Sequence, residues 1–119
     1  MQYMLMIYTP PGTWESMSEE ERNARMGEYY DYTDSLEAAG VLRAGAPLET
    51  VDSATTVRVR DGERLTTDGP FAETREVLGG YYVIEVETLD EALDHAARIP
   101  GARHGSIEVR PVVQVPARK

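Results

Sequence analysis

Hydrophobic and polar residues follow two different periods along this chain of 119 residues. Short apolar or alternating runs predict strands, and these runs cover 2–8, 41–48, 55–60, 63–67, 77–87 and 106–110. Two other stretches repeat their apolar residues every three or four positions, as amphipathic helices do. In the first, 18–39, the repeating residues are Met26, Tyr29, Tyr30, Thr33 and Leu36. The second helix lies between Thr88 and Pro100.

Both predicted helices carry signals at their ends. Ser18 is followed three positions later by Glu21, and Thr88 by Glu91, so each pair has the spacing of a capping box. Gly40 follows the first helix, where glycine commonly ends a helix. These signals fix where the helices begin and end, and they agree with the periodicity.

The predicted order is strand-helix-strand, a hairpin at Asp61-Gly62, and a second strand-helix-strand unit. Two such halves describe a ferredoxin-like α+β fold, with both helices on one face of an antiparallel sheet. We predict a single domain over residues 1–119. The other face of the sheet also carries apolar residues but has no helix to cover it, so we predict a homodimer.

Composition excludes several classes of function. The chain has no cysteine, which rules out disulfides, thiolate metal sites and cysteine nucleophiles. No apolar run is long enough to span a membrane, and a net charge of −9 argues against nucleic acid and anionic membranes as partners. With two distant histidines and no cysteine, a dedicated zinc site is not expected, and no spacing of carboxylates suggests a site for a harder metal. We expect a cytoplasmic protein that needs no cofactor.

Asp68-Gly69-Pro70-Phe71 is the most distinctive segment of the sequence. Glycine permits unusual φ values and proline fixes its own, so the segment predicts a shaped turn with Asp68 on one side and Phe71 on the other. If Phe71 shields the Asp68 carboxyl from water, Asp68 becomes a candidate general acid or base. The alternative is that Asp68 caps the turn by accepting backbone N–H bonds.

The segment Thr67–Thr74 resembles the signature of the DGPF-type branch of the YCII-related family. Other matching stretches are Tyr3–Tyr8, Gly40-Val41-Leu42, Leu78–Tyr82 and Arg103–Pro111. The resemblance implies a dimeric α/β barrel. Some relatives look like lyases or dehydrochlorinases that act on small aromatic compounds, and a His–Asp pair is the proposed catalytic centre of the broader family. The genes of DGPF-type proteins are often found near those of extracytoplasmic-function sigma factors.

His104, one of two histidines, is the candidate partner of Asp68, because a histidine between the second helix and the last strand could shuttle protons near neutral pH. It departs from the broader family's pattern, in which the histidine lies earlier in the chain, where this sequence has none. A loop histidine bonded to backbone is the alternative interpretation. Five further residues are candidates for a ligand-binding pocket beside the turn: Tyr8, Phe71, Glu73, Arg75 and Tyr82. Arg75 suits a carboxylate ligand, although Glu73 and Arg75 could equally pair with each other.

Two functions are compatible with these residues. The first is a cofactor-free acid–base enzyme, of lyase or isomerase type, that acts on a small organic molecule in a pocket beside the turn. The second is a ligand-binding or regulatory module without catalysis, linked to extracytoplasmic-function sigma factors through a protein partner. An enzyme requires Asp68 in a concave, partly apolar pocket with a second titratable group nearby.

Overall fold

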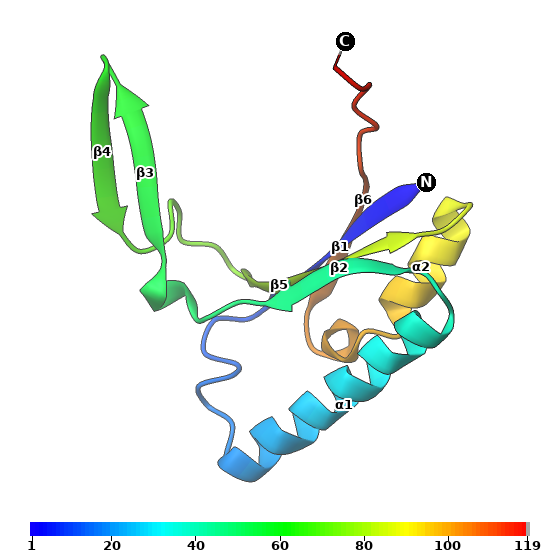
Figure 1. Ribbon diagram of the computed structural model, residues 1–119. Helices are drawn as coiled ribbons and strands as arrows, with labels where there is room; N and C mark the ends of the chain where they lie inside the picture. Colours follow the sequence, from blue (N-terminus) through cyan, green and yellow to red (C-terminus); the bar gives the residue numbers. More distant parts are fainter. Residues whose placement is uncertain (119) are drawn as a thin grey trace.

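The computed structural model describes residues 1–118 (Figure 1). Six strands and two α-helices follow one another in the predicted order, and two short 3₁₀ helices, which the sequence analysis did not predict, lie between them. Their bounds are β1 Gln2–Thr9, α1 Glu19–Ala38, β2 Leu42–Pro47, η1 Val51–Ser53, β3 Thr55–Arg60, β4 Glu63–Asp68, β5 Val77–Glu85, α2 Leu89–Ala97, η2 Pro100–Arg103 and β6 Ser106–Pro111.

Four strands form an antiparallel sheet in the order β2-β5-β1-β6. Both helices lie on one face of this sheet (Figure 1). This is the ferredoxin-like α+β fold that the sequence predicts. In the part of the chain that the structure describes, neither helix is long and apolar enough to cross a membrane.

The helix ends show how local sequence fixes the elements. At α1 the capping box is complete, because Glu21 N donates to Ser18 Oγ and Ser18 N donates to Glu21 Oε1, both at 3.1 Å. At α2 only half of the predicted box forms. Thr88 Oγ1 accepts from Glu91 N, but the Glu91 carboxylate accepts from Glu87 N, at 3.4 Å. Each helix therefore begins where the sequence places it.

The core lies between the helices and the sheet. Alternate residues of β1 and β5 face it, and only Tyr32 and Leu36 of α1 are buried. The Tyr32 hydroxyl donates to the carbonyl of His95 at 2.7 Å, and its ring packs edge-on against Tyr82. The C-terminal half of α1 is thus fixed to both α2 and the sheet.

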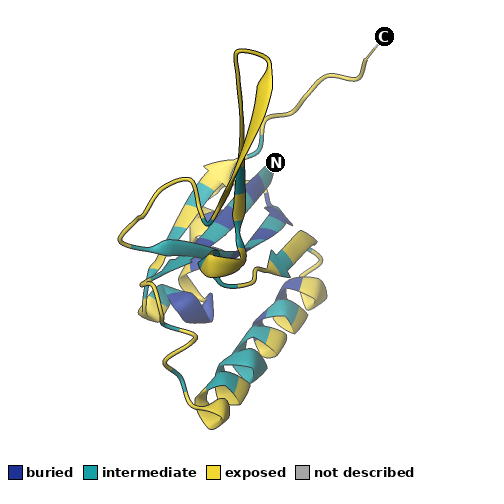
Figure 2. Ribbon diagram, turned by 90° about the vertical axis from the view of Figure 1, so that its left-hand side faces the viewer, coloured by how far each residue is buried: buried dark blue, intermediate teal, exposed yellow. Residues whose placement is uncertain are grey.

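Strands β3 and β4 form a separate two-stranded hairpin, which we call the arm. Its turn residues Asp61 and Gly62 both have positive φ values, 53° and 77°, as an Asp-Gly hairpin turn requires. The arm stands away from the sheet on the side opposite to the helices (Figure 1), and nearly all of it is exposed (Figure 2).

Candidate functional site

A cleft of about 970 Å³ lies between α1 and the sheet. It exists because the segment 10–18 carries the start of α1 away from the sheet, so that only the C-terminal half of α1 packs closely. Six of its lining residues are Trp14, Met26, Tyr29, Thr33, Leu42 and Tyr82. A mostly apolar concavity of this size, with a few polar groups, is typical of small-molecule sites.

Two tyrosines of the cleft lining, Tyr29 and Tyr82, have hydrogen-bonded hydroxyl groups. The hydroxyls of Thr33 and Tyr82 lie 2.8 Å apart, while the Tyr29 hydroxyl accepts a bond from Gly101 N at 3.1 Å. Burial raises the pKa of both Tyr29 and Tyr82, so both phenols stay protonated at neutral pH. The Tyr29 hydroxyl accepts from Gly101 N and still carries its own proton, and the Thr33–Tyr82 pair uses one of its two hydroxyl protons for the bond between them. One O–H proton at each place therefore remains for a further acceptor.

Two glycines allow these tyrosines to sit where they do. A Cβ at Gly45 would lie 2.8 Å from Tyr82 Cδ1, and one at Gly101 would lie 2.8 Å from the Tyr29 hydroxyl oxygen. Both distances are far below van der Waals contact. The close approach of β2 and η2 to the two rings therefore depends on glycine at both positions.

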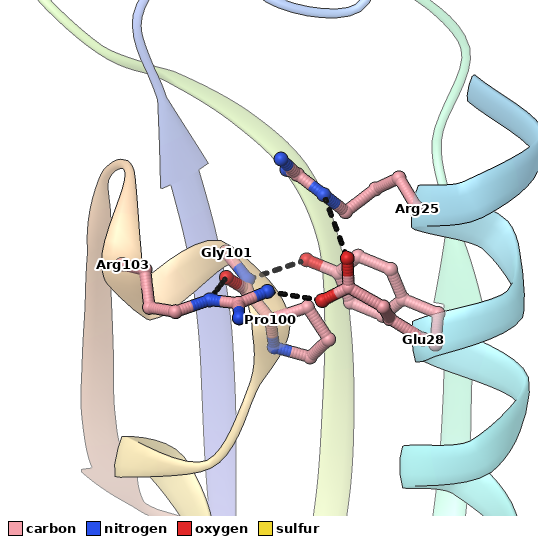
Figure 3. A network of polar contacts seen from close by, with 6 residues as sticks. Arg25, Glu28, Pro100, Gly101 and Arg103 are labelled. Carbon is pink, nitrogen blue, oxygen red and sulfur yellow. Dashed lines mark hydrogen bonds and ion pairs between the residues drawn. The ribbon is translucent and has the colours of Figure 1, made fainter. Parts of the chain in front are cut away.

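Arg25 is a cleft residue whose side chain is only 17% exposed. Its Nε lies 3.8 Å from Glu28 Oε1, and the other Glu28 oxygen pairs with Arg103. Arg103 in turn donates to the carbonyl of Pro100 (Figure 3). Among the described residues, the terminal nitrogens of Arg25 have no hydrogen bond to protein. A partly desolvated guanidinium with free donors is suited to an anion.

The loop at the mouth of the cleft is held by Arg22. Its side chain donates to the carbonyls of Trp14 and Glu15, each at 3.0 Å, and its guanidinium lies 5.9 Å from the centre of the Trp14 ring. These contacts place Trp14 in the cleft wall and leave its ring partly exposed.

The structure separates most of the residues singled out from sequence. Tyr82 lines the cleft, whereas Tyr8 belongs to the alternate set of β1 that faces away from the helices. The remaining five, Asp68, Phe71, Glu73, Arg75 and His104, are all exposed and outside the cleft lining. No hydrogen bond or ion pair joins any two of the seven within residues 1–118.

The Asp68-Gly69-Pro70-Phe71 turn lies at the base of the arm. Gly69 has a φ of 96°, its N–H donates to the carbonyl of Ala54 at 2.7 Å, and its carbonyl accepts from the Thr56 hydroxyl at 2.8 Å. The positive φ of Gly69 is the unusual glycine conformation that the sequence predicts here. However, Phe71 is 76% exposed, so within one chain it does not shield Asp68 from water.

The sequence analysis did not single out Arg25, and it assigned Tyr29 and Thr33 to the apolar stripe of the helix. Arg25, Tyr29 and Thr33 are spaced by four residues and therefore share one face of α1, which lines the cleft. The predicted apolar stripe includes Tyr30, which is 64% exposed, while the buried tyrosine of α1 is Tyr32. The four-residue spacing of Arg25, Tyr29 and Thr33 was the sequence signal that could have identified this face. Residues 1–118 contain no cluster of three potential metal ligands.

The buried phenols predict a loss of stability at alkaline pH. Burial raises the pKa of Tyr29, Tyr32 and Tyr82, whereas in the unfolded chain these groups titrate near 10. The folded state thus favours the protonated phenols, and its free energy of unfolding should fall as pH rises past about 10. Urea unfolding between pH 8 and 10.5 measures this, and Tyr32→Phe should show a shallower fall. An equal fall in this variant would contradict the assignment.

Comparison with known proteins shows what the chain is similar to. The family model for the YCII-related domain matches residues 1–116. The uncharacterized protein R00369 of Rhizobium meliloti (strain 1021) is 38% identical over 114 residues, which cover 94% of this chain and 92% of that protein. The solved structure of 5-chloro-2-hydroxyhydroquinone dehydrochlorinase (TftG) from Burkholderia phenoliruptrix AC1100, in complex with 2,5-dihydroxybenzoquinone, matches with a TM-score of 0.55. That match is at 15% identity and covers 97% and 96% of the two chains.

Proposed function

The chain belongs to the YCII-related family, and we propose that its cleft binds a small aromatic anion for cofactor-free acid–base chemistry of the lyase or isomerase type. The observation that carries the proposal is the guanidinium of Arg25, which keeps two terminal nitrogens without a hydrogen bond to the described residues, in a cleft walled by Trp14, Tyr29 and Tyr82. Aromatic walls suit a flat ring. A guanidinium suits a carboxylate or phenolate on that ring, because its planar donors can bond two oxygens or one.

The protonated tyrosines give this site a chemical role beyond binding. Eliminations and isomerisations next to an oxygen-bearing carbon build up negative charge on that oxygen. Neutral phenol donors and a cation, fixed in a partly desolvated cleft, stabilise such charge without reorganising. Tyr29 and Tyr82 would donate to the oxygen while Arg25 offsets its charge. The similarity to TftG, a dehydrochlorinase solved with a dihydroxybenzoquinone, supports a ring compound of this kind.

The base that removes a proton is a separate part of the proposal. Asp34 is a candidate because it lines the cleft and directly follows Thr33 in α1, although Glu15, Glu37 and Glu49 also line the cleft. Asp68 and His104 remain predicted catalytic residues, and because both are exposed here, such roles require a covering element from outside the chain. Rates for Asp68→Asn and His104→Gln, on a compound that the wild type turns over, decide this. Unchanged rates would remove both residues from the mechanism.

We also propose that the protein is a homodimer joined through the sheet face that carries no helix. Five half-buried residues of this face are Met4, Met6, Tyr8, Tyr81 and Val83. Such a run of apolar and aromatic side chains on an uncovered sheet is a usual site of protein association.

A binding panel tests the proposed function. We expect 2,5-dihydroxybenzoquinone and benzoate to bind saturably and to change the fluorescence of Trp14, the only tryptophan. Benzyl alcohol and cyclohexanecarboxylate, which lack the charge or the aromatic ring, should bind at least about tenfold more weakly, as the loss of one good interaction predicts. Equal binding of all four would contradict an aromatic-anion site. Binding without turnover across the panel would favour the non-catalytic ligand-binding module instead.

A further inference from the structure

The arm and the C-terminal segment present apolar side chains to solvent. Val57, Val59 and Leu65 of the arm are between 46% and 61% exposed, and Val113 and Val115 are 79% and 83% exposed. The pairing of β3 with β4 places Val57 and Val59 on one face of the hairpin and Leu65 on the other. An isolated two-stranded hairpin is marginally stable in water, so this one needs something to pack against.

Both segments project on the same side of the molecule. They rise from opposite ends of the sheet, on the face without helices, and leave that face between them (Figure 1). Their extension gives the chain a radius of gyration of 16.6 Å. A compact domain of this length would have about 13–14 Å. The arm and the C-terminal segment therefore flank the open sheet face on two sides, and nearly all of the arm is uncovered (Figure 2).

The open face alone is small for a stable interface. Four strands of six to nine residues, spaced by about 4.8 Å, give a flat footprint on the order of 500 Å². A stable interface buries about 800 Å² on each partner. The central part of the face is apolar, but its edge strand β6 carries Ser106, Glu108 and Arg110. The apolar surface of the arm can therefore enlarge a dimer interface through this face.

We propose that the arm clasps a second copy of this chain, so that two arms are exchanged across paired open faces. The proposal rests on the homodimer proposed above and adds the surface that completes it. In a twofold dimer, each arm contacts the equivalent surface of the other copy, so the apolar patch of the arm adds to the interface at two places. The motif turn lies at the base of the arm, and the clasp thus covers Phe71. The burial that the Asp68-Gly69-Pro70-Phe71 turn lacks within one chain then comes from the partner.

A double substitution on the arm provides the main test. Val57→Glu with Val59→Glu keeps the hairpin, because these positions face Thr66 and Arg64 across the strands. We expect sedimentation equilibrium to show a dimer dissociation constant at least about tenfold above wild type, since charges would enter an apolar interface. The matched control, Leu89→Glu with Leu93→Glu, places the same charges on similarly exposed residues of α2 and should leave the constant unchanged.

Cross-linking gives a second readout that does not depend on affinity. The chain has no cysteine, so Val59→Cys provides a single attachment point for a benzophenone maleimide. Irradiation should yield a covalent dimer from this variant and none from Leu93→Cys. A dimer that forms equally well with the double arm variant and does not cross-link at position 59 would overturn the clasp, as would a wild type that stays monomeric. Binding of the four panel ligands to the same variants tests the cleft separately from the dimer.

Discussion

Gly105→Ala should destabilise this protein more than an alanine substitution at any other glycine. A Cβ at this position would lie 2.0 Å from the carbonyl oxygen of Tyr8 and 3.0 Å from Thr9 Cα. Both atoms belong to the backbone and cannot rotate away. Relief requires β1 and β6 to separate next to the pair Tyr8–Ser106. We expect the free energy of unfolding to fall by about 3 kcal/mol or more, at the upper end of overpacking effects.

Gly27→Ala is the matched control. Gly27 lies inside α1, and a Cβ there would meet nothing within 4 Å. Alanine favours the helix over glycine by about 0.5–1 kcal/mol, so this variant should be slightly more stable than wild type. Urea unfolding of both variants at pH 7 measures both changes in the free energy of unfolding, which should have opposite signs. A Gly105→Ala variant within about 0.5 kcal/mol of wild type would contradict the close approach, since that is the range of neutral surface changes.

The fold could be predicted because its signals are local. The Ser18–Glu21 box, Gly40 and Asp61-Gly62 each fix the backbone within a few residues, and all three have the predicted geometry. The direction of the arm could not be predicted. The alternation along Thr55–Arg60 shows only that a strand has two different faces. Whether either face is covered depends on the rest of the molecule, and here neither is.

The site was harder to predict for a related reason. The turn at 68–71 attracts attention because its residue types are unusual, while Arg25, Tyr29 and Thr33 look like an ordinary helix face. Periodicity identifies the side of a helix that faces the sheet, but it does not give the distance between them. Here that distance is set by the loop 10–18, whose anchoring by Arg22 involves carbonyl groups that no side-chain pattern reveals.

Arg25→Gln should weaken binding of aromatic anions strongly and selectively. Glutamine keeps much of the side chain's length and polarity but removes the charge. A hydrogen bond to a charged group contributes about 1.5–3 kcal/mol, which corresponds to a dissociation constant roughly 10–150-fold higher for benzoate. Benzyl alcohol, which has no charge, should lose at most about twofold, well within 1 kcal/mol. Titrations followed by Trp14 fluorescence compare the two ligands on each variant.

Arg103→Gln separates direct contact from indirect positioning. Arg103 pairs with the same carboxylate, Glu28, but it is not part of the cleft lining. If Arg25 binds the anion itself, Arg103→Gln leaves benzoate affinity close to that of wild type, because Arg25 keeps its free nitrogens. Equal losses in the two variants would mean that Glu28 and its ion pairs position α1 and that Arg25 contributes no direct contact. Equal losses for both ligands in Arg25→Gln would point to a collapsed cleft. Only a loss confined to the anion and to Arg25 identifies this guanidinium as the group that recognises the ligand.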